Sequence, residues 1–293
     1  MRHALALIVC AGCSASPAQS LVAALPARAE LHVDVPAAAD TADGGATTTA
    51  QLYLVTHQTS TQLNGAVDSV LDLIGKITSQ PPTHAGPDVA EWGPFTPSLS
   101  PATYRLLVHR VAPDQVQYHL DGRPKDASDD AAFQPIITGL SNDGSDARAG
   151  QFAVDVNLAH ALDPAANPGT GALQASYQLA AATAVRMQLG DGTAAAAYRY
   201  DRGPDGSGDF RFATHANITG DPTNLEDGIV RSRWLPSGAG RGDAHVRNGD
   251  AGAGMDLSEC WDPSFARTFV TNGKDAGGDP ASCVFPDAVF ADL

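Results

Sequence analysis

The sequence lacks the short motifs by which the common enzyme classes are recognised. It contains no GxSxG nucleophile elbow, no HExxH zinc-binding helix, no P-loop and no GxGxxG fingerprint after a strand. Each of those motifs supplies groups that its reaction requires, such as an activated serine, paired histidine ligands or backbone N–H groups around a phosphate. We therefore expect a protein without enzymatic activity, and we expect no cofactor and no bound metal.

Positively charged residues are also few. There are 18 Lys and Arg residues against 33 Asp and Glu residues, which gives a formal net charge of −15. Such a surface repels the phosphate backbone of nucleic acids, so we expect no nucleic-acid partner. Many of the acidic residues fall in turn segments, where Asp forms local hydrogen bonds with the backbone. A solvated acidic surface is the favoured interpretation, and a hydrolase that uses scattered carboxylates is kept as a third hypothesis.

Aromatic residues make up only 6% of the chain, whereas Gly and Pro number 29 and 20. This composition is typical of a β protein that is rich in turns. The 43% hydrophobic fraction is enough for a core, although much of it is Ala, which buries little area per residue. No shift in composition marks a second domain, so we expect one domain over residues 47–293.

The four cysteines fall into two pairs, one near each end of the chain, and Cys10 and Cys13 form the first pair. Cys260 and Cys283 lie near the C-terminus, and no histidine cluster at zinc-finger spacing accompanies them. We predict a disulfide between them, which would close a loop of about 24 residues and contribute about 3 kcal/mol. That prediction requires an oxidising compartment. Two separate buried thiols are the alternative.

The first segment, MRHALALIVCAGC, has a basic start and a short apolar run that is too short to span a bilayer. Its end, Ala11-Gly12-Cys13, resembles the bacterial lipobox, although Cys10 stands where that pattern has Leu. The resemblance implies a signal peptide over residues 1–12 and an acylated Cys13 that anchors the protein to a membrane.

Ser14 follows the cysteine, and in the lipoprotein pattern this implies an outer-membrane location in the bacterial cell envelope. Two alternatives stay open, namely ordinary secretion with cleavage near Ala15 or Ala18, and a cytosolic N-terminal strand. Residues 13–46 are rich in Ala, Pro, Asp and Gly, so they are expected to be a tether or linker. Within it, Glu30–Val35 alternates like a short strand.

Residues 47–79 predict one long helix. Apolar and Thr residues recur every three or four positions and so share one face. Leu54, Leu71 and Leu73 fall outside that stripe, which indicates a helix covered on more than one side. The helix is expected to begin among three threonines, Thr47–Thr49, and to end before Pro81. Gly65 and Gly75 mark either a kink or a close crossing by a strand.

The chain after residue 100 reads as strands separated by turn chemistry, without helical patterns between them. We therefore predict an α+β fold, mainly antiparallel β, with a curved meander sheet or half-barrel around one long N-terminal helix. The expected strands are Thr103–Val111, Gln115–Leu120, Phe133–Thr138, Gln151–Leu158, Leu173–Leu179, Ala184–Leu189, Ala195–Tyr200, Phe210–Asn217, Ile229–Leu235 and Asp243–Arg247.

The C-terminal segment is expected to cover one end of the sheet. Ser258–Val270 predicts a short helix with Trp261, Phe265 and Phe269 on one side. The predicted disulfide between Cys260 and Cys283 would pin this segment in place.

Three weaker patterns have plain structural interpretations. A metal shared by His109 and His119 would need a third ligand, which the sequence does not show, so exposed strand histidines are favoured. The segment Asp201–Asp209 imitates the start of a calcium loop but lacks its closing Glu, so a hairpin turn is favoured. The tripeptide Arg241-Gly242-Asp243 lies in a Gly-rich turn and is interpreted as a chance match to an adhesion motif.

The long helix, the passage WGPFTPSLSPATYRL and the tail ECWD…CVFPD together resemble a family of uncharacterised predicted bacterial lipoproteins. That resemblance implies no known activity. The expected architecture resembles lipid-carrier lipoproteins, which hold acyl chains between sheet and helix. We therefore expect a non-enzymatic envelope lipoprotein that binds a lipid or other apolar ligand. A structural or adhesive envelope protein with a packed core is the alternative, and an enclosed apolar cavity would separate the two.

Overall fold

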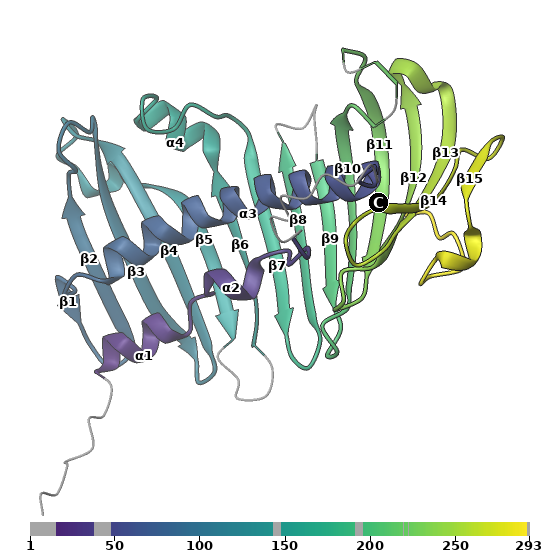
Figure 1. The fold of residues 1–293 in the computed structure, drawn as a ribbon. Coiled ribbons are helices and arrows are strands. Elements are labelled where there is room, and N and C mark those ends of the chain that lie inside the picture. The colour runs from purple at the N-terminus through teal and green to yellow at the C-terminus, as the bar shows by residue number, and fades with distance from the viewer. Residues whose placement is uncertain are drawn as a thin grey trace, which may run out of the picture.

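The computed structural model describes residues 16–37, 48–142, 148–190, 196–218, 220–221 and 223–291. Within these residues fifteen strands form one antiparallel sheet, and each strand pairs with its neighbours in the sequence (Figure 1). The sheet is open and curled, so the predicted antiparallel meander is confirmed. The strands are β1 (His84–Ala85), β2 (Val89–Phe95), β3 (Ala102–Ala112), β4 (Gln115–Pro124), β5 (Gln134–Asn142), β6 (Arg148–Asp155), β7 (Ala172–Leu179), β8 (Thr183–Gly190), β9 (Ala196–Arg202), β10 (Gly208–Ala216), β11 (Glu226–Trp234), β12 (Gly240–Asn248), β13 (Gly252–Trp261), β14 (Arg267–Thr271) and β15 (Ala276–Gly278).

The N-terminal part differs from the single helix that was expected. Three helices precede the sheet, namely α1 (Pro17–Ala23), α2 (Arg28–Leu31) and α3 (Gln51–Thr78). In α1, Ser16 forms a capping box with Gln19, and Pro17 occupies the first helical turn. The short strand expected over Glu30–Val35 is absent, because residues 28–31 are helical and residues 32–37 have no regular structure. Residues 1–15, which include the proposed signal peptide and Cys13, lie outside the described residues.

Helix α3 crosses the sheet on its concave side, which we call the inner face; the opposite side is the outer face (Figure 1). Its first turn lies against β13, where the N–H of Leu52 bonds to Glu259. Its C-terminal end lies at β2, where Nε1 of Trp92 donates a hydrogen bond of 2.8 Å to the carbonyl of Gln80. The helix therefore runs across the strands in the order opposite to the chain.

Helix α3 is buried on the side that faces the sheet, and residues 28–36 lie along a second side, where Asn64 bonds to the backbone of Val33. Leu52 and Val67 are fully buried against the sheet, whereas Leu54 and Leu73 are 45% and 41% exposed. Leu71 is half-buried and packs on the core, so the helix is covered on more than one side over part of its length only. A polar contact also lies in this interface, because the hydroxyls of Thr56 and Ser232 are 2.6 Å apart.

The inner face is packed by aromatic side chains that lie over glycines of the neighbouring strand. A Cβ at Gly139 would lie 2.0 Å from Cζ of Tyr118, and a Cβ at Gly150 would lie 2.3 Å from the hydroxyl oxygen of Tyr177. The two tyrosine rings occupy the space that side chains at these glycines would need. The hydroxyl of Tyr177 is 2.7 Å from that of Ser141, so this polar contact is buried in the core.

Two of the expected elements are wrong, one at its end and the other over its whole length. The strand expected over Gln151–Leu158 stops at Asp155, whose side chain accepts a hydrogen bond of 2.8 Å from the N–H of Leu158 and caps α4 (Val156–Leu162). The helix expected over Ser258–Val270 is instead the end of β13, a turn and β14. In that turn Oδ1 of Asp262 accepts hydrogen bonds from the N–H groups of Ser264 and Ala266, which breaks the helical path.

Candidate functional site on the outer face of the sheet

The register of the strands aligns ten outward residues in one cross-strand row. Each is the direct partner of the next on the neighbouring strand, so the row crosses the sheet from β4 to β13. We call these residues the outer row: Gln117, Leu140, Gln151, Ser176, Arg186, Arg199, Arg211, Arg231, Asp243 and Ser258.

The first half of the outer row lies in a hollow of about 820 Å³ that extends from the end of β3 to β8. Five amide side chains contribute to its lining, with the hydroxyls of Thr138 and Ser176 between them, Arg186 at one end, and apolar residues such as Leu140 beside them. An amide both donates and accepts hydrogen bonds, so this surface suits a polar ligand that bears hydroxyl groups. The amides are Gln115, Gln117, Gln151, Gln174 and Gln188.

In the second half of the outer row, arginines face one another on four successive strands, β8 to β11. Like charges in direct register repel one another and destabilise a sheet. Two aspartates in the adjacent row offset this repulsion. Asp201 accepts hydrogen bonds of 2.6 and 3.1 Å from Nε and Nη2 of Arg199.

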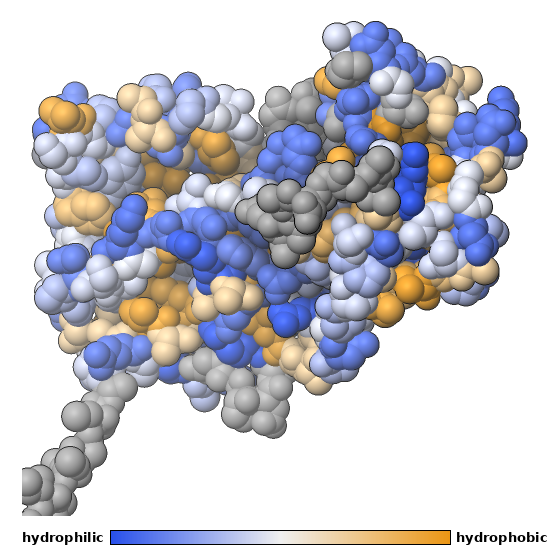
Figure 2. All heavy atoms as spheres, in the orientation of Figure 1, coloured by the Kyte–Doolittle hydropathy of each residue, from blue (hydrophilic) through white to orange (hydrophobic). Residues whose placement is uncertain are grey.

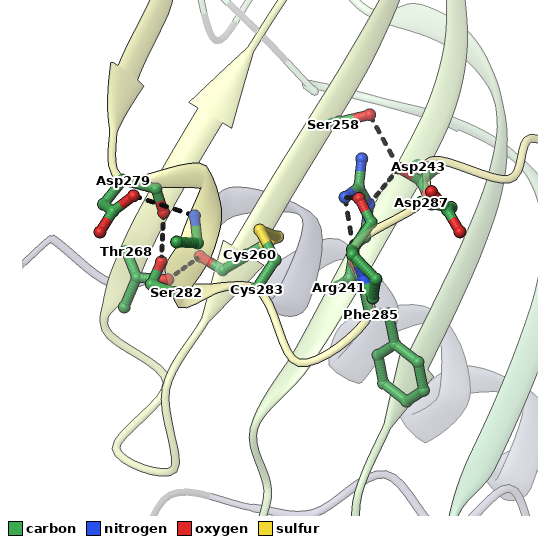
Figure 3. Close-up of a disulfide and its surroundings, with 12 residues drawn as sticks. Arg241, Asp243, Ser258, Cys260, Thr268, Asp279, Ser282, Cys283, Phe285 and Asp287 are labelled. Atoms are coloured by element: carbon green, nitrogen blue, oxygen red, sulfur yellow. Dashed lines mark hydrogen bonds and ion pairs between the residues drawn. A yellow bond between two sulfur atoms is a disulfide. The ribbon is translucent and has the colours of Figure 1, made fainter.

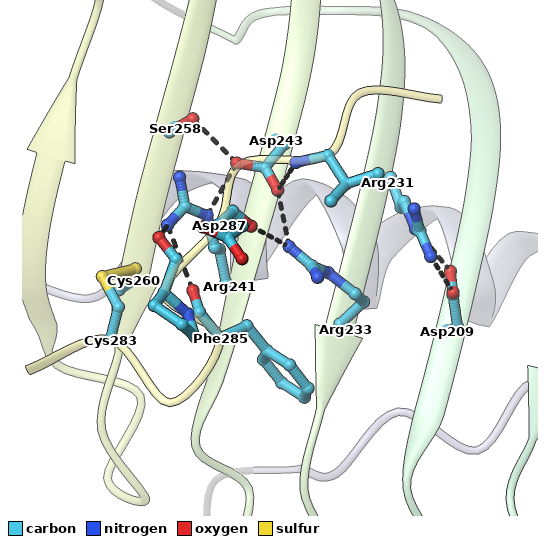
Figure 4. Close-up of polar contacts among 12 residues, drawn as sticks. Asp209, Arg231, Arg233, Arg241, Asp243, Ser258, Cys260, Cys283, Phe285 and Asp287 are labelled. Carbon is cyan, nitrogen blue, oxygen red and sulfur yellow. Dashed lines mark hydrogen bonds and ion pairs between the residues drawn. A yellow bond between two sulfur atoms is a disulfide. The ribbon is translucent and has the colours of Figure 1, made fainter. Parts of the chain in front are cut away.

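Asp209 serves two of the arginines at once. Nε and Nη2 of Arg231 donate to its two oxygens at 3.0 and 2.5 Å, and those of Arg211 donate at 3.3 and 3.1 Å. Figure 4 shows Asp209 and Arg231 facing each other across two strands. Burial opposes ionisation of Asp209, but the hydrogen bonds from Arg231 and Arg211 outweigh it and lower the pKa of Asp209.

Beyond Arg231 the outer row is covered by residues 283–291, which we call the C-terminal segment. Asp243 is fully buried there and accepts hydrogen bonds from Arg241 at 2.8 Å, Arg233 at 3.0 Å and Ser258 at 2.7 Å (Figure 4). The N–H of Val289 donates a fourth, at 3.0 Å. Every oxygen of this buried carboxylate is therefore used to hold the sheet and the C-terminal segment together.

The predicted disulfide between Cys260 and Cys283 is present, with a Cα–Cα distance of 5.4 Å. It attaches the C-terminal segment to β13 beside the cluster around Asp243 (Figure 3). Arg241 extends from the same cluster and donates to the carbonyls of Phe285 and Pro286 at 3.1 and 2.9 Å. Arg241 and Asp243 are only 4% and 0% exposed, so the Arg-Gly-Asp tripeptide is not presented for adhesion.

His109 and His119 do approach across the first hairpin, with ring centroids 6.4 Å apart. Nδ1 of His119 lies 2.8 Å from Asp121, which also accepts a hydrogen bond from Arg105. Burial and the neighbouring His119 lower the pKa of His109. Among the described residues no group of three or more His, Cys, Asp or Glu residues is arranged to hold a metal ion.

Three further carboxylates, those of Asp205, Glu226 and Glu259, accept hydrogen bonds from backbone N–H groups. Asp205 accepts hydrogen bonds from the N–H and hydroxyl of Ser207, as expected of a turn. Glu226 accepts from the N–H groups of Ile218 and Asp250 at 2.7 and 3.0 Å. Burial raises the pKa of Glu259, which bonds to the first turn of α3. Each of these carboxylates has a structural use.

The outer row was missed by reasoning from the sequence. Alternation identifies the residues that share a face of each strand, but not the partners that they meet on the next strand. The recurrence of Arg at an outward position in four strands was the available signal, and only the register converts it into a row.

No family model matches the chain, and neither a curated protein nor a solved structure matches it. Within the described residues, no helix combines the length and the apolar character needed to cross a membrane.

Proposed function

We propose that the protein is a non-enzymatic binding protein of an oxidising compartment, and that it binds a polar, hydroxyl-bearing ligand on the outer face of its sheet. The observation that supports this proposal is the difference between the two faces. The inner face is covered by helices and packed with buried aromatic residues. The outer face of β4 to β8 is open to solvent, and amides and hydroxyls lie in the lining of its hollow beside apolar residues such as Leu140.

The cell envelope is the location that we propose, with Cys13 as the site of lipidation. The disulfide between Cys260 and Cys283 supports a compartment in which disulfides persist. The resemblance of residues 11–13 to a lipobox supports a lipid anchor, and with it an outer-membrane location. Replacement of Cys13 by Ser should release the protein from membranes, and unchanged membrane association would contradict the anchor.

Carriage of an apolar ligand is the second candidate. Figure 2 supports it, because apolar side chains are exposed in the gaps on both sides of α3. The space beneath α3 is less favourable, since large inner-face side chains such as Tyr118, Tyr200 and Phe210 are themselves almost fully buried. An apolar ligand would therefore have to occupy the gaps beside the helix.

Equilibrium binding distinguishes the two candidates. The full chain is titrated with maltoheptaose and oligogalacturonate as hydroxyl-bearing probes, and with a fluorescent fatty acid as the apolar probe. We expect one of the hydroxyl-bearing probes to bind, and the double variant Gln151→Ala/Gln174→Ala to weaken that binding about tenfold through loss of amide hydrogen bonds.

The matched control is Leu54→Gln, an exposed position on the inner side of the molecule. It should leave binding of the hydroxyl-bearing probe unchanged. Stoichiometric binding of the fatty acid, with neither oligosaccharide bound, would overturn the proposal in favour of the carrier.

A further inference from the structure

The four arginines of the outer row form a cationic track in an acidic protein. Arg186, Arg199, Arg211 and Arg231 are direct partners on β8 to β11. Neighbouring strands are about 4.8 Å apart, so the four positions extend over about 14 Å across the sheet. The chain as a whole has the opposite character, because its formal net charge is −15.

Each paired arginine keeps one edge of its guanidinium unused. In Arg199, Arg211 and Arg231 the aspartates accept hydrogen bonds from Nε and Nη2 only. The side chains of Arg199, Arg211 and Arg231 are 38%, 24% and 16% exposed, so all three are partly open to solvent. An arginine fork binds a carboxylate through parallel N–H groups on two nitrogens, and one N–H of Nη1 and the second N–H of Nη2 remain for such a contact.

Arg186 differs from the three paired arginines. It is exposed, and no hydrogen bond or ion pair joins it to another of the described residues. It is also the only arginine in the lining of the amide-rich hollow, so it joins the two halves of the outer row. The four arginines face two aspartates, Asp201 and Asp209, so these six side chains together carry a net charge of +2.

We propose that the outer row binds an acidic polysaccharide whose chain lies across the strands, with hydroxyl groups over the amides of β4 to β8 and carboxylates at the arginines of β8 to β11. This inference rests on the proposed function, because it names the ligand class of the same face. The track ends where the C-terminal segment covers Asp243, so the bound polymer extends from β4 to β11. Seven steps between strands correspond to about 34 Å of polymer.

Two features of the surface favour a carboxylate polymer with hydroxyls over other polyanions. Apart from Arg186 at its end, the amide half of the row has no cation to offer the successive phosphates of a phosphate backbone. Glutamine side chains can both donate hydrogen bonds to sugar hydroxyls and accept hydrogen bonds from them. A polysaccharide presents hydroxyl groups in every unit, whereas an acidic peptide does not.

The experiment is calorimetric titration of the full chain with an oligogalacturonate of ten or more units at low ionic strength. We expect binding that weakens as salt is added. Arg186→Gln removes the unpaired cation and should weaken binding about fivefold. The double variant Arg199→Gln/Asp201→Asn leaves the net charge unchanged and should also weaken binding, which separates a local contact from a general charge effect.

Lys76→Gln is the matched control, because it also removes one exposed positive charge but lies on α3, on the other side of the sheet. It should bind the oligogalacturonate as the unaltered protein does. Equal thermal unfolding of Arg186→Gln and the unaltered protein shows that the fold is retained.

Failure of this inference can be distinguished from failure of the proposed function. If maltoheptaose binds as well as the oligogalacturonate and Arg186→Gln has no effect, this inference is overturned and the proposed function stands. If neither oligosaccharide binds, both are overturned. Tighter binding of oligoglutamate or of a single-stranded DNA oligonucleotide would overturn the assignment to a polysaccharide.

Discussion

The carboxylate of Glu259 on β13 accepts a hydrogen bond of 2.6 Å from the backbone N–H of Leu52 in the first turn of α3. The N-cap residue of this helix is Ala50, whose methyl side chain cannot accept hydrogen bonds from the free N–H groups. The expectation that a threonine caps the helix is therefore wrong. A strand that is 207 residues away in the sequence supplies the cap instead.

The first prediction is that Glu259→Gln is tolerated and Glu259→Ala is not. Glutamine keeps an oxygen that accepts from Leu52, whereas alanine removes the cap and should lower the free energy of unfolding by about 1–2 kcal/mol. Urea denaturation at pH 7 measures both. An alanine variant as stable as the unaltered protein would show that the contact contributes nothing.

The second prediction concerns pH. Burial raises the pKa of Glu259 above its ordinary value of 4.5, so the folded state binds this proton more tightly than the unfolded state does. Its contribution to stability is fully present below pH 4.5 and is lost as the pH rises through the folded-state pKa. The stability of Glu259→Gln relative to the unaltered protein should therefore increase over that range. If the difference in free energy of unfolding between Glu259→Gln and the unaltered protein does not change between pH 4 and pH 8, the prediction is contradicted.

The third prediction uses glycines in two environments. A Cβ added at Gly65 or Gly75 of α3 would meet no atom within 4 Å, so neither glycine marks a close crossing by a strand. Ala at either position should stabilise the protein by about 1 kcal/mol, because Gly is a poor helix former. Gly139→Ala is the contrasting variant, since its Cβ would overlap the ring of Tyr118 and should cost at least about 1–3 kcal/mol. Thermal unfolding that ranks Gly139→Ala with the helical variants would contradict this account.

The elements that could be predicted are those that local patterns specify. The 3.6-residue period identified α3, and alternation with turn residues identified strands such as β3 and β7. The same reasoning failed at Ser258–Val270, where aromatic residues four apart imitate a helix. There the Asp262 turn and the pairing of β13 with β12 and β14 decide the structure.

The candidate site depended on information that a single sequence does not contain. Arg186, Arg199, Arg211 and Arg231 are separated by loops of different lengths, and only the strand register brings them into one row. The disulfide could be predicted, because it needed only the number of cysteines and a compartment. The Cys13 prediction falls outside the described residues.

The fourth prediction is that the disulfide stabilises the C-terminal segment on the outer face. The double variant Cys260→Ser/Cys283→Ser should lower the free energy of unfolding by about 3 kcal/mol, because the unfolded chain regains the entropy of an open loop. Protection of residues 283–291 from hydrogen exchange should fall before that of β11. Added reductant should have the same effect on the unaltered protein and none on the variant. Unchanged stability would mean that Arg241 and Asp243 alone hold the segment.

The fifth prediction is that Asp243 is the costliest single charge to remove from the outer face. Asp243→Asn leaves Arg233 and Arg241 buried without their counter-charge, so the free energy of unfolding should fall by about 3–5 kcal/mol. Asp256→Asn is the matched control on the same face, because its side chain is 57% exposed and pairs with His245 alone among the described residues. That control should change stability by less than about 0.5 kcal/mol. Urea denaturation compares the two variants, and equal losses would show that burial of Asp243 does not set its contribution.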